Sequence, residues 1–384
     1  MYETHLNERK LDLDWPMLLA ACGLAVTGVL FIFSATGDAS QGQRFFRQPF
    51  FLQVVWIAAG AGAAVAVCLV DYRKLARWAR AVYWAAMASL AAVLVIGKMV
   101  HGGRRWISLG VIRIQPSEFA KIAFIFLLAD FLSRPAEELR QPKVFFAALG
   151  YAALPFVLIM KEPDLGSALV FLSVCLAMMF VAGVPNRFLG KLAASVVPVV
   201  VLMVGTIVFA PERITFIKDY QKARLLSYFG LGDRKEMEAA NYNVNQSLIS
   251  VGSGGWLGKG WRQGTQHENG FLPLAGADND FIFSVIAEEE GFVGSVVILT
   301  LYSVLLFSGL KVASQARDRL GQLLAVGVVT LLFTHVFINI GMNIRLMPVT
   351  GIPLPLLSYG GASVVCSLIA IGVLLNVHIY RKSY

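Results

Sequence analysis

Charge is scarce in this sequence. Only 15% of its 384 residues are Asp, Glu, Lys or Arg, while 57% are hydrophobic; a soluble globular chain carries about 25% charged residues. This shortage of charge excludes an ordinary cytosolic enzyme, and the abundance of apolar residues excludes a disordered chain. Because about 20 apolar residues suffice for one helical crossing of a bilayer, we expect an all-α, polytopic membrane protein.

Cysteine is also rare. Each of the four cysteines lies alone in an apolar run, without the spacing of a metal site or a disulfide framework. They are best interpreted as packing residues. The formal charge of +9 comes with no basic helix and no Cys/His module, which disfavours a nucleic-acid-binding protein. Membrane proteins collect Lys and Arg in cytoplasmic loops, and this is the simpler source of the excess.

Ten apolar runs divide the chain. They cover residues 17–35, 50–70, 79–97, 117–132, 144–160, 165–183, 188–210, 281–309, 321–342 and 361–379. Most are long enough to span a bilayer, although the run at 117–132 is short and carries three charged residues. We therefore expect about ten transmembrane helices in one integral membrane domain that covers residues 1–384. An even number of crossings places both termini on one side.

The distribution of Lys and Arg predicts which side that is. With the N-terminus in the cytoplasm, the inner segments hold sixteen Lys and Arg residues and the short outer loops hold eight. This bias predicts that both termini are cytoplasmic. The first run has no convincing cleavage site, so we expect an uncleaved anchor rather than a signal peptide.

One connection, residues 211–280, is much longer than the others. It lies between the seventh and eighth predicted helices, is polar and Gly-rich, and is extracytoplasmic in this topology. Loops of this length are usually functional or disordered. Its aromatic residues favour an ordered loop.

Ionisable residues in or beside the apolar runs are the candidate functional residues, because charge at membrane depth is costly. Glu118 and Lys121 lie three residues apart on one face of a predicted helix, with Arg113 just before it. They can form an internal salt bridge that closes the bundle, or a polar seam in which Arg113 lies near a phosphate. Asp164 stands at another helix start, where it can cap the helix, hold a cation or orient a basic partner.

Asp280 stands at the first apolar residue of a predicted helix, where the long loop meets the bilayer. A half-desolvated carboxylate there can act as a general base; an N-cap aided by the helix dipole is the alternative. Asp278 lies two residues earlier. Glu288, Glu289 and Glu290 follow about two to three turns deeper, and because three adjacent carboxylates cannot all face lipid, some must point into the protein.

Two irregular segments complete the candidates. The Gly-rich stretch around Lys259 lacks the Ser or Thr of a P-loop and follows no predicted strand, so it is weak as a nucleotide motif. As an amide-rich loop near Lys259 and Arg262, it could bind a lipid-linked diphosphate. Residues 348–361 place three prolines and three glycines beside an apolar run. Simple loop packing and a substrate-facing rim are the two interpretations of that segment.

Taken in order, these segments resemble the SEDS family of bacterial cell-wall polymerases over nearly the whole chain. No single motif is decisive. The resemblance rests on the ordered set Arg105-Trp106-Ile107, Gln115-Pro116-Ser117-Glu118 with Lys121, Pro163-Asp164-Leu165-Gly166, Gly252-Ser253-Gly254-Gly255, Gly258-Lys259-Gly260-Trp261, Gly264-Thr265-Gln266, Asp280-Phe281-Ile282-Phe283 and Pro355-Leu356-Leu357-Ser358-Tyr359-Gly360-Gly361. Residues 351–355 are more similar to the elongation branch of the family than to its division branch.

The resemblance implies a peptidoglycan glycosyltransferase that polymerises lipid II on the outer side of the bacterial cytoplasmic membrane during elongation. It implies that Asp280 is the essential carboxylate and that Glu118, Lys121 and Asp164 are the family's other polar site residues. Before Asp280 the chain is two residues longer than the family pattern, so Asp278 remains a second candidate. The expected partner is a class B penicillin-binding protein, a transpeptidase, within the elongation machinery.

The resemblance also implies a mechanism. Asp280 accepts the proton of the acceptor's GlcNAc 4-hydroxyl, whose oxygen attacks the anomeric carbon of the lipid-linked donor, and undecaprenyl diphosphate leaves with inversion. Arg113, Arg224 or a divalent cation (Mg²⁺ or Mn²⁺) is expected to neutralise the diphosphate, and no organic cofactor is expected. The alternatives are a flippase or transporter of lipid-linked precursors, a division-specific polymerase, and a scaffold that only activates the transpeptidase.

Overall fold

A helix occupies each of the ten apolar runs. The computed structural model describes residues 13–36, 45–100, 103–109, 112–209, 226, 228, 234–268 and 277–381. The ten helices are α1 (Trp15–Thr36), α2 (Pro49–Leu69), α4 (Ala79–Ile96), α5 (Pro116–Leu132), α7 (Pro142–Lys161), α8 (Leu165–Val181), α9 (Asn186–Phe209), α14 (Ile282–Ser314), α15 (Arg319–Asn343) and α16 (Gly361–Tyr380). The prediction of a helical, polytopic membrane protein is therefore confirmed.

Seven of these helices are long and apolar enough to cross a membrane within the described part of the chain: α1, α2, α4, α7, α14, α15 and α16. Helix α8 is apolar but only 17 residues long. Helix α5 also has 17 residues and carries the three charges noted in its run. Helix α5 begins at Pro116 after Gln115, and α8 begins after its capping residue Asp164.

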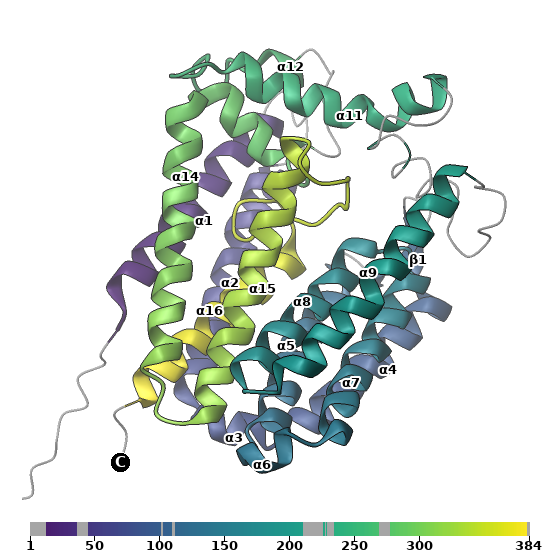
Figure 1. Ribbon diagram of the computed structural model, residues 1–384. Helices are drawn as coiled ribbons and strands as arrows, with labels where there is room; N and C mark the ends of the chain where they lie inside the picture. Colours follow the sequence, from purple (N-terminus) through teal and green to yellow (C-terminus); the bar gives the residue numbers. More distant parts are fainter. Residues whose placement is uncertain are drawn as a thin grey trace, which may run out of the picture.

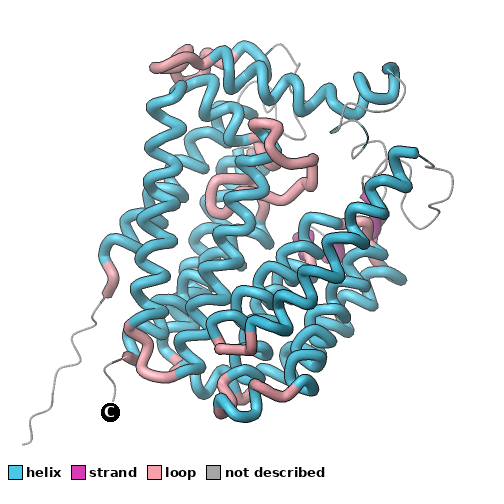
Figure 2. The backbone as a smooth tube through the Cα atoms, viewed as in Figure 1, coloured by secondary structure: helices cyan, strands magenta, loops and turns pink. Residues whose placement is uncertain are grey.

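The connections contain shorter elements: η1 (Phe45–Arg47), α3 (Tyr72–Ala76) and α6 (Ala136–Leu139). Between α4 and α5, three strands form an antiparallel sheet in the order β1 (Lys98–Val100), β2 (Gly103–Leu109) and β3 (Ile112–Ile114), with Ile107 opposite Ile114. No sequence pattern indicates this sheet, because strands of three to seven residues are too short for a clear period-two pattern. Figure 2 shows that strands occur in this one place among the described residues.

The helices form two groups (Figure 1). The first contains α1, α2, α14, α15 and α16, and the second contains α4, α5, α7, α8 and α9. Helix α15, the most buried of the seven spans, contacts both α5 and α8 and so joins the groups. Close packing of α16 on α2 depends on small residues: a Cβ on Gly372 would lie 2.8 Å from the Cα of Ala64.

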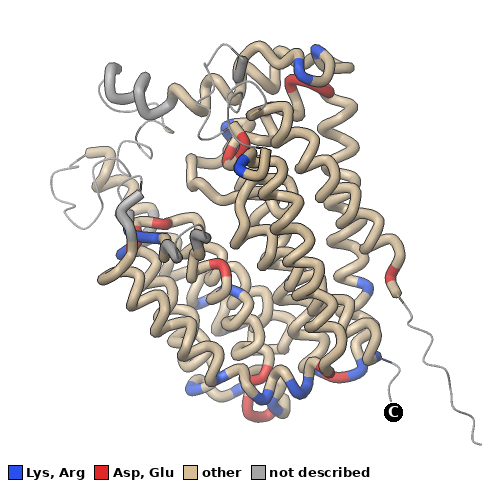
Figure 3. Tube along the Cα trace, turned by 180° about the vertical axis from the view of Figure 1, so that it is seen from behind, with Lys and Arg blue, Asp and Glu red and all other residues tan. Residues whose placement is uncertain are grey.

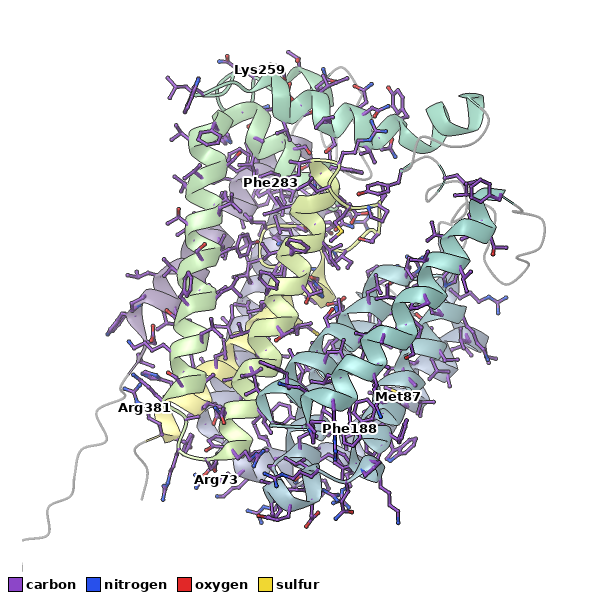
Figure 4. The ribbon with its side chains drawn as sticks, viewed as in Figure 1. Arg73, Met87, Phe188, Lys259, Phe283 and Arg381 are labelled. Carbon is purple, nitrogen blue, oxygen red and sulfur yellow. The ribbon has the colours of Figure 1, made fainter. Side chains whose placement is uncertain are left out.

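Lys and Arg residues gather at the lower end of the molecule, near the C-terminus (Figure 3). Arg73 and Arg381 mark this end in Figure 4, and Lys259 marks the upper end. Helix α1 begins at the lower end, because Asp14 lies 3.9 Å from Lys311 in the last turn of α14. Among the described residues, the Lys and Arg of the predicted inner segments therefore lie toward this one end.

Helix α14 is not one straight crossing, and this corrects the sequence analysis. Gly291 has a non-helical backbone (φ 65°, ψ −157°) that separates residues 282–290 from residues 292–314. The Gly-rich turn (residues 254–260) wraps this break, because the amides of Phe292 and Val293 donate to the carbonyls of Gly255 and Trp256. The three glutamates 288–290 therefore lie at a bend near the upper end, and the expectation that they lie deeper than Asp280 is wrong.

The long connection contains two further helices among its described residues, α11 (Arg234–Ser253) and α12 (Thr265–Glu268). Helix α11 lies across the upper end of the first helix group in Figure 1 and contacts α14 and α15. The described part of this loop is thus folded onto the bundle.

Candidate functional site

Asp280 lies in the turn that leads into α14 and is half-buried. Its backbone carbonyl accepts hydrogen bonds from the side-chain amides of two residues on α15, Asn339 (3.0 Å) and Asn343 (3.1 Å). The neighbouring carbonyls are held as well: Asn279 accepts from Ser358 Oγ (2.6 Å), and Asp278 accepts from the Tyr359 amide (2.8 Å). Three consecutive peptide groups are therefore fixed, so the backbone position from which the Asp280 side chain extends is well defined.

The Pro- and Gly-rich residues between α15 and α16, the 344–360 loop, lie against this turn. Asn339 also donates to the carbonyl of Ile352 (2.7 Å), so one amide group joins the loop to Asp280. Gly351 has a positive φ of 72°, and a Cβ there would lie 3.4 Å from Asp280 Oδ2. The loop is therefore packed against protein, and it borders the candidate carboxylate.

Asp278 has a different environment from a solvent-exposed aspartate. Burial raises the pKa of Asp278 to about 6, and its own backbone hydrogen bond opposes the shift. Its carbonyl, rather than its carboxylate, makes the contact with Tyr359. The carboxylate of Asp278 can therefore be removed without breaking that hydrogen bond.

Glu118 and Lys121 form the predicted ion pair, with Lys121 Nζ 2.7 Å from Glu118 Oε1. Both are almost fully buried, and a third residue joins them: Lys121 Nζ lies 2.9 Å from Nε2 of His335 on α15. His335 Nδ1 lies 3.4 Å from the Pro353 carbonyl. A carbonyl can only accept, so Nδ1 carries the proton and Nε2 accepts from the ammonium group.

Asp164 caps α8, as the first of its three interpretations predicts. Its Oδ1 accepts from the Ser167 amide (3.1 Å) and its Oδ2 from the Ser167 hydroxyl (3.0 Å). Arg105 of β2 holds the same turn: its Nε donates to the Glu162 carbonyl (2.8 Å), and its Nη1 lies 3.9 Å from Asp164. Gly166 in the first turn leaves no room for a Cβ beside Ile352 of the 344–360 loop.

Lys259 lies apart from Asp280, at the upper end (Figure 4). Its Nζ is 2.5 Å from Glu288 Oε1 and 2.7 Å from the Thr265 hydroxyl, while its amide donates to the Glu288 carbonyl. The Gly260 amide donates to the Glu289 carbonyl. These amides stabilise the break in α14, so the geometry does not support a diphosphate cradle in this turn.

Two predicted cationic residues are not characterised by the structure. Arg113 lies in β3, where only its backbone is described. Arg224 lies outside the described residues.

The 344–360 loop brings the separate candidates together. Pro353 contacts the Glu118–Lys121–His335 cluster, Ile352 packs on the start of α8, and Gly351 faces Asp280. The residues missed by sequence reasoning are His335, Asn339 and Asn343. Their four-residue spacing places them on one face of α15, and three polar residues so spaced in an apolar run are a signal that could have identified them.

Comparisons with known proteins agree with this arrangement. Residues 15–383 match the FtsW/RodA/SpoVE family, described as cell cycle proteins. Peptidoglycan glycosyltransferase MrdB of Escherichia coli is 36% identical over 377 residues, which cover 97% of this chain and 95% of that protein.

Two solved structures are similar along the whole chain. One belongs to a peptidoglycan synthase complex described as coordinating polymerization and crosslinking (TM-score 0.80, 28% identity, 97% of this chain and 100% of that chain). The other is the rod shape determining protein RodA of Thermus thermophilus (TM-score 0.68, 28% identity, 98% and 99%). The three-stranded sheet, the broken α14 and the Asp280 turn are thus features of a member of the FtsW/RodA/SpoVE family, to which this chain belongs.

Proposed function

We propose that this protein polymerises lipid II into glycan strands during cell elongation and releases undecaprenyl diphosphate. Membership of the family, together with its relatives named peptidoglycan glycosyltransferases, makes the chain a peptidoglycan glycosyltransferase. The observation that carries the chemistry is the half-buried Asp280, whose backbone is held by α15 and whose carboxylate borders the 344–360 loop.

In the proposed reaction, Asp280 accepts the proton of the acceptor's GlcNAc 4-hydroxyl. The bond from that oxygen to the anomeric carbon of the donor forms as the bond from this carbon to the diphosphate breaks, and the α-linkage becomes β. General-base catalysis contributes about 10²- to 10⁴-fold to such a step. Asp280 suits this role because the peptide groups on its N-terminal side are already fixed, which lowers the cost of bringing the reacting atoms together.

The leaving diphosphate needs positive charge. Arg113 and Arg224 remain our candidates for it. Among the described residues, no three His, Cys, Asp or Glu side chains converge as a metal site. A Mg²⁺ or Mn²⁺ ion stays a prediction, and it would depend on substrate phosphates as ligands.

We place the reaction on the extracytoplasmic side. The basic lower end, where α1 begins and α16 ends, supports cytoplasmic termini. Phe283, three residues after Asp280, lies toward the opposite end in Figure 4. A class B penicillin-binding protein is the proposed partner, supported by the similarity to a chain of a peptidoglycan synthase complex.

The test compares two conservative variants of the purified full-length protein with its partner. Asp280→Asn is expected to lower strand synthesis from lipid II by at least about a hundredfold. Asp278→Asn is expected to keep activity within about threefold, because its backbone contact with Tyr359 is retained. Melting temperatures of both variants report whether they are folded.

Four other outcomes would contradict the proposal. Normal strand synthesis by Asp280→Asn would show that Asp280 is not the general base. Loss of synthesis in Asp278→Asn alone would assign that role to Asp278. Movement of lipid II across liposomes without polymer would favour the flippase. Depletion that produces filaments rather than round cells would assign the division role.

A further inference from the structure

Three polar side chains, His335, Asn339 and Asn343, line one face of α15, and two of them serve the Asp280 turn. Asn339 and Asn343 have no exposed surface. A buried amide in an apolar helix must find hydrogen-bond partners within the protein. For both asparagines, one of those partners is the same backbone oxygen, the carbonyl of Asp280.

The donors of Asn339 are fully used. Its amide nitrogen donates to the carbonyls of Ile352 (2.7 Å) and Asp280 (3.0 Å), and an amide group has two donors. Asn343 donates to Asp280 (3.1 Å) and to the carbonyl of Asn339 one turn earlier (2.8 Å). The pair therefore ties the start of α14 to the 344–360 loop at the point where Gly351 meets the carboxylate.

Two hydroxyl groups fix the orientation of Asn343. Its Oδ1 accepts from Ser284 on α14 (2.5 Å) and lies 3.1 Å from Ser247 Oγ on α11. Both serines are fully buried. The carbonyls of Asp280 and Asn339 can only accept, so the nitrogen of Asn343 faces them and its oxygen faces the two hydroxyl groups.

We infer that Asn339 and Asn343 are positioning residues, which hold the backbone of Asp280 so that its carboxylate meets the acceptor hydroxyl in one geometry. This inference rests on the proposed function of Asp280. Displacement of a reacting group by about 1 Å can cost a hundredfold in rate. Removal of the two asparagine amides is therefore expected to lower kcat and to leave the affinity for lipid II unchanged.

The chain offers a matched control in Asn376 on α16. This asparagine is also fully buried, and its amide donates to the backbone carbonyls of Val67 and Val70 at the end of α2. Its Oδ1 accepts from the amide of Tyr72, next to Arg73 at the lower end. Asn376 resembles Asn339 and Asn343 in residue type, burial and hydrogen bonding, but its hydrogen bonds hold the end of α2 and not the Asp280 turn.

The experiment measures kcat, KM for lipid II and melting temperature for Asn339→Ala, Asn343→Ala and Asn376→Ala in the full chain with its partner. Hydrogen–deuterium exchange of peptides covering residues 277–284 is followed in the same proteins. Asn339→Ala and Asn343→Ala are expected to lower kcat about tenfold or more, to leave KM within about twofold and to accelerate exchange at 277–284. Asn376→Ala is expected to lower the melting temperature while kcat and this exchange stay at wild-type values.

A second comparison separates positioning from general stability. In an Asp280→Asn background, Asn343→Ala is expected to leave the residual rate unchanged, because the group that it positions is gone. If the alanine variants fold poorly, Ser247→Ala removes a hydroxyl group that contacts both Asn343 and Ser284, and it is expected to lower kcat two- to fivefold.

Unchanged kcat and exchange in both asparagine variants would overturn the inference. So would an equal loss of kcat in Asn376→Ala, or a multiplicative loss in the Asp280→Asn background. If exchange at 277–284 rises as expected while wild-type protein makes no polymer, the structural role stands and the proposed function fails.

Discussion

Buried polar side chains in this protein reach partners in different ways. Glu118 and Lys121 neutralise each other and share His335, whereas the asparagines of α15 bind backbone carbonyls. Glu162, in the turn between α7 and α8, is different: it is buried, and neither carboxylate oxygen has a hydrogen-bond partner. A buried carboxylate without partners favours its neutral form.

Glu162→Gln is expected to stabilise the protein at alkaline pH. Burial, and next the nearby Asp164, raise the pKa of Glu162 to about 8 from an ordinary value of 4.5, with Arg105 acting in the opposite direction. Between these two pH values the folded protein keeps a proton that the unfolded chain has lost, so the free energy of unfolding falls as pH rises. The variant should melt a few degrees above wild type at pH 9 and together with it at pH 4.

Glu137→Gln, at an exposed position on α6, is the control for this measurement and should leave the melting curve unchanged at both pH values. A constant difference between Glu162→Gln and wild type from pH 4 to pH 9 would contradict the explanation.

Lys121→Met is expected to destabilise the protein by about 3–5 kcal/mol, because it leaves Glu118 as an uncompensated buried charge. The double variant Glu118→Gln/Lys121→Met removes both charges and should recover much of that loss in a thermal melt. Polymerisation by the double variant then separates the two interpretations of the pair. Full activity indicates a structural salt bridge, and continued inactivity of a stable protein indicates a role in the site.

The break in helix α14 is stabilised by a separate segment of the chain, the Gly-rich turn. Gly291 interrupts the helix, and the Gly-rich turn satisfies the backbone groups that the break exposes. Gly258 of that turn has a φ of 76°, and a Cβ there would overlap the carbonyl of Glu289. Gly254 and Gly258 therefore serve close backbone packing, and their role needs no bound phosphate.

Gly258→Ala is expected to cost about 1–3 kcal/mol, from the unfavourable φ and from displacement of the turn. Gly252→Ala is the matched control, since a Cβ there meets nothing within 4 Å. Melting temperatures of the two variants in detergent check the difference. Equal stability would show that the turn does not hold the break in α14.

The whole molecule is polarised along its long axis. Lys and Arg gather at the lower end, where Arg73 pairs with Asp318 at 2.7 Å, while α11 and the Gly-rich turn cover part of the upper end. Helix α15 contacts helices of both groups. It supplies the two asparagines that bind the Asp280 carbonyl and the histidine that lies beside Lys121. Orientation in the membrane is therefore a property of the entire bundle.

The proposed orientation predicts which engineered cysteines can be labelled from outside. In a variant without the four native cysteines, Leu257→Cys at the exposed Gly-rich turn should react with a membrane-impermeant maleimide on spheroplasts. Arg317→Cys, exposed between α14 and α15, should react only after the membrane is opened. The reverse pattern would invert the topology.

Much of the candidate site could be predicted from local patterns. Glu118 with Lys121 follows from helical spacing, and the capping role of Asp164 follows from its place at a helix start. Three polar residues of α15 were missed because each lies in or directly beside an apolar run, where hydropathy averages hide single polar residues. They are His335, Asn339 and Asn343. The sheet and the break at Gly291 were missed because both depend on pairing with other segments.

The sequence by itself determined the membrane class, the ten helices and the polar residues worth testing, because apolar length and the cost of buried charge are local properties. Only the tertiary structure decided which of those residues meet. The 344–360 loop reaches His335, the start of α8 and Asp280 at once, and α15 holds the Asp280 turn through long-range hydrogen bonds. Contacts between segments that are distant in the sequence depend on how the helices pack, and no local sequence pattern determines them.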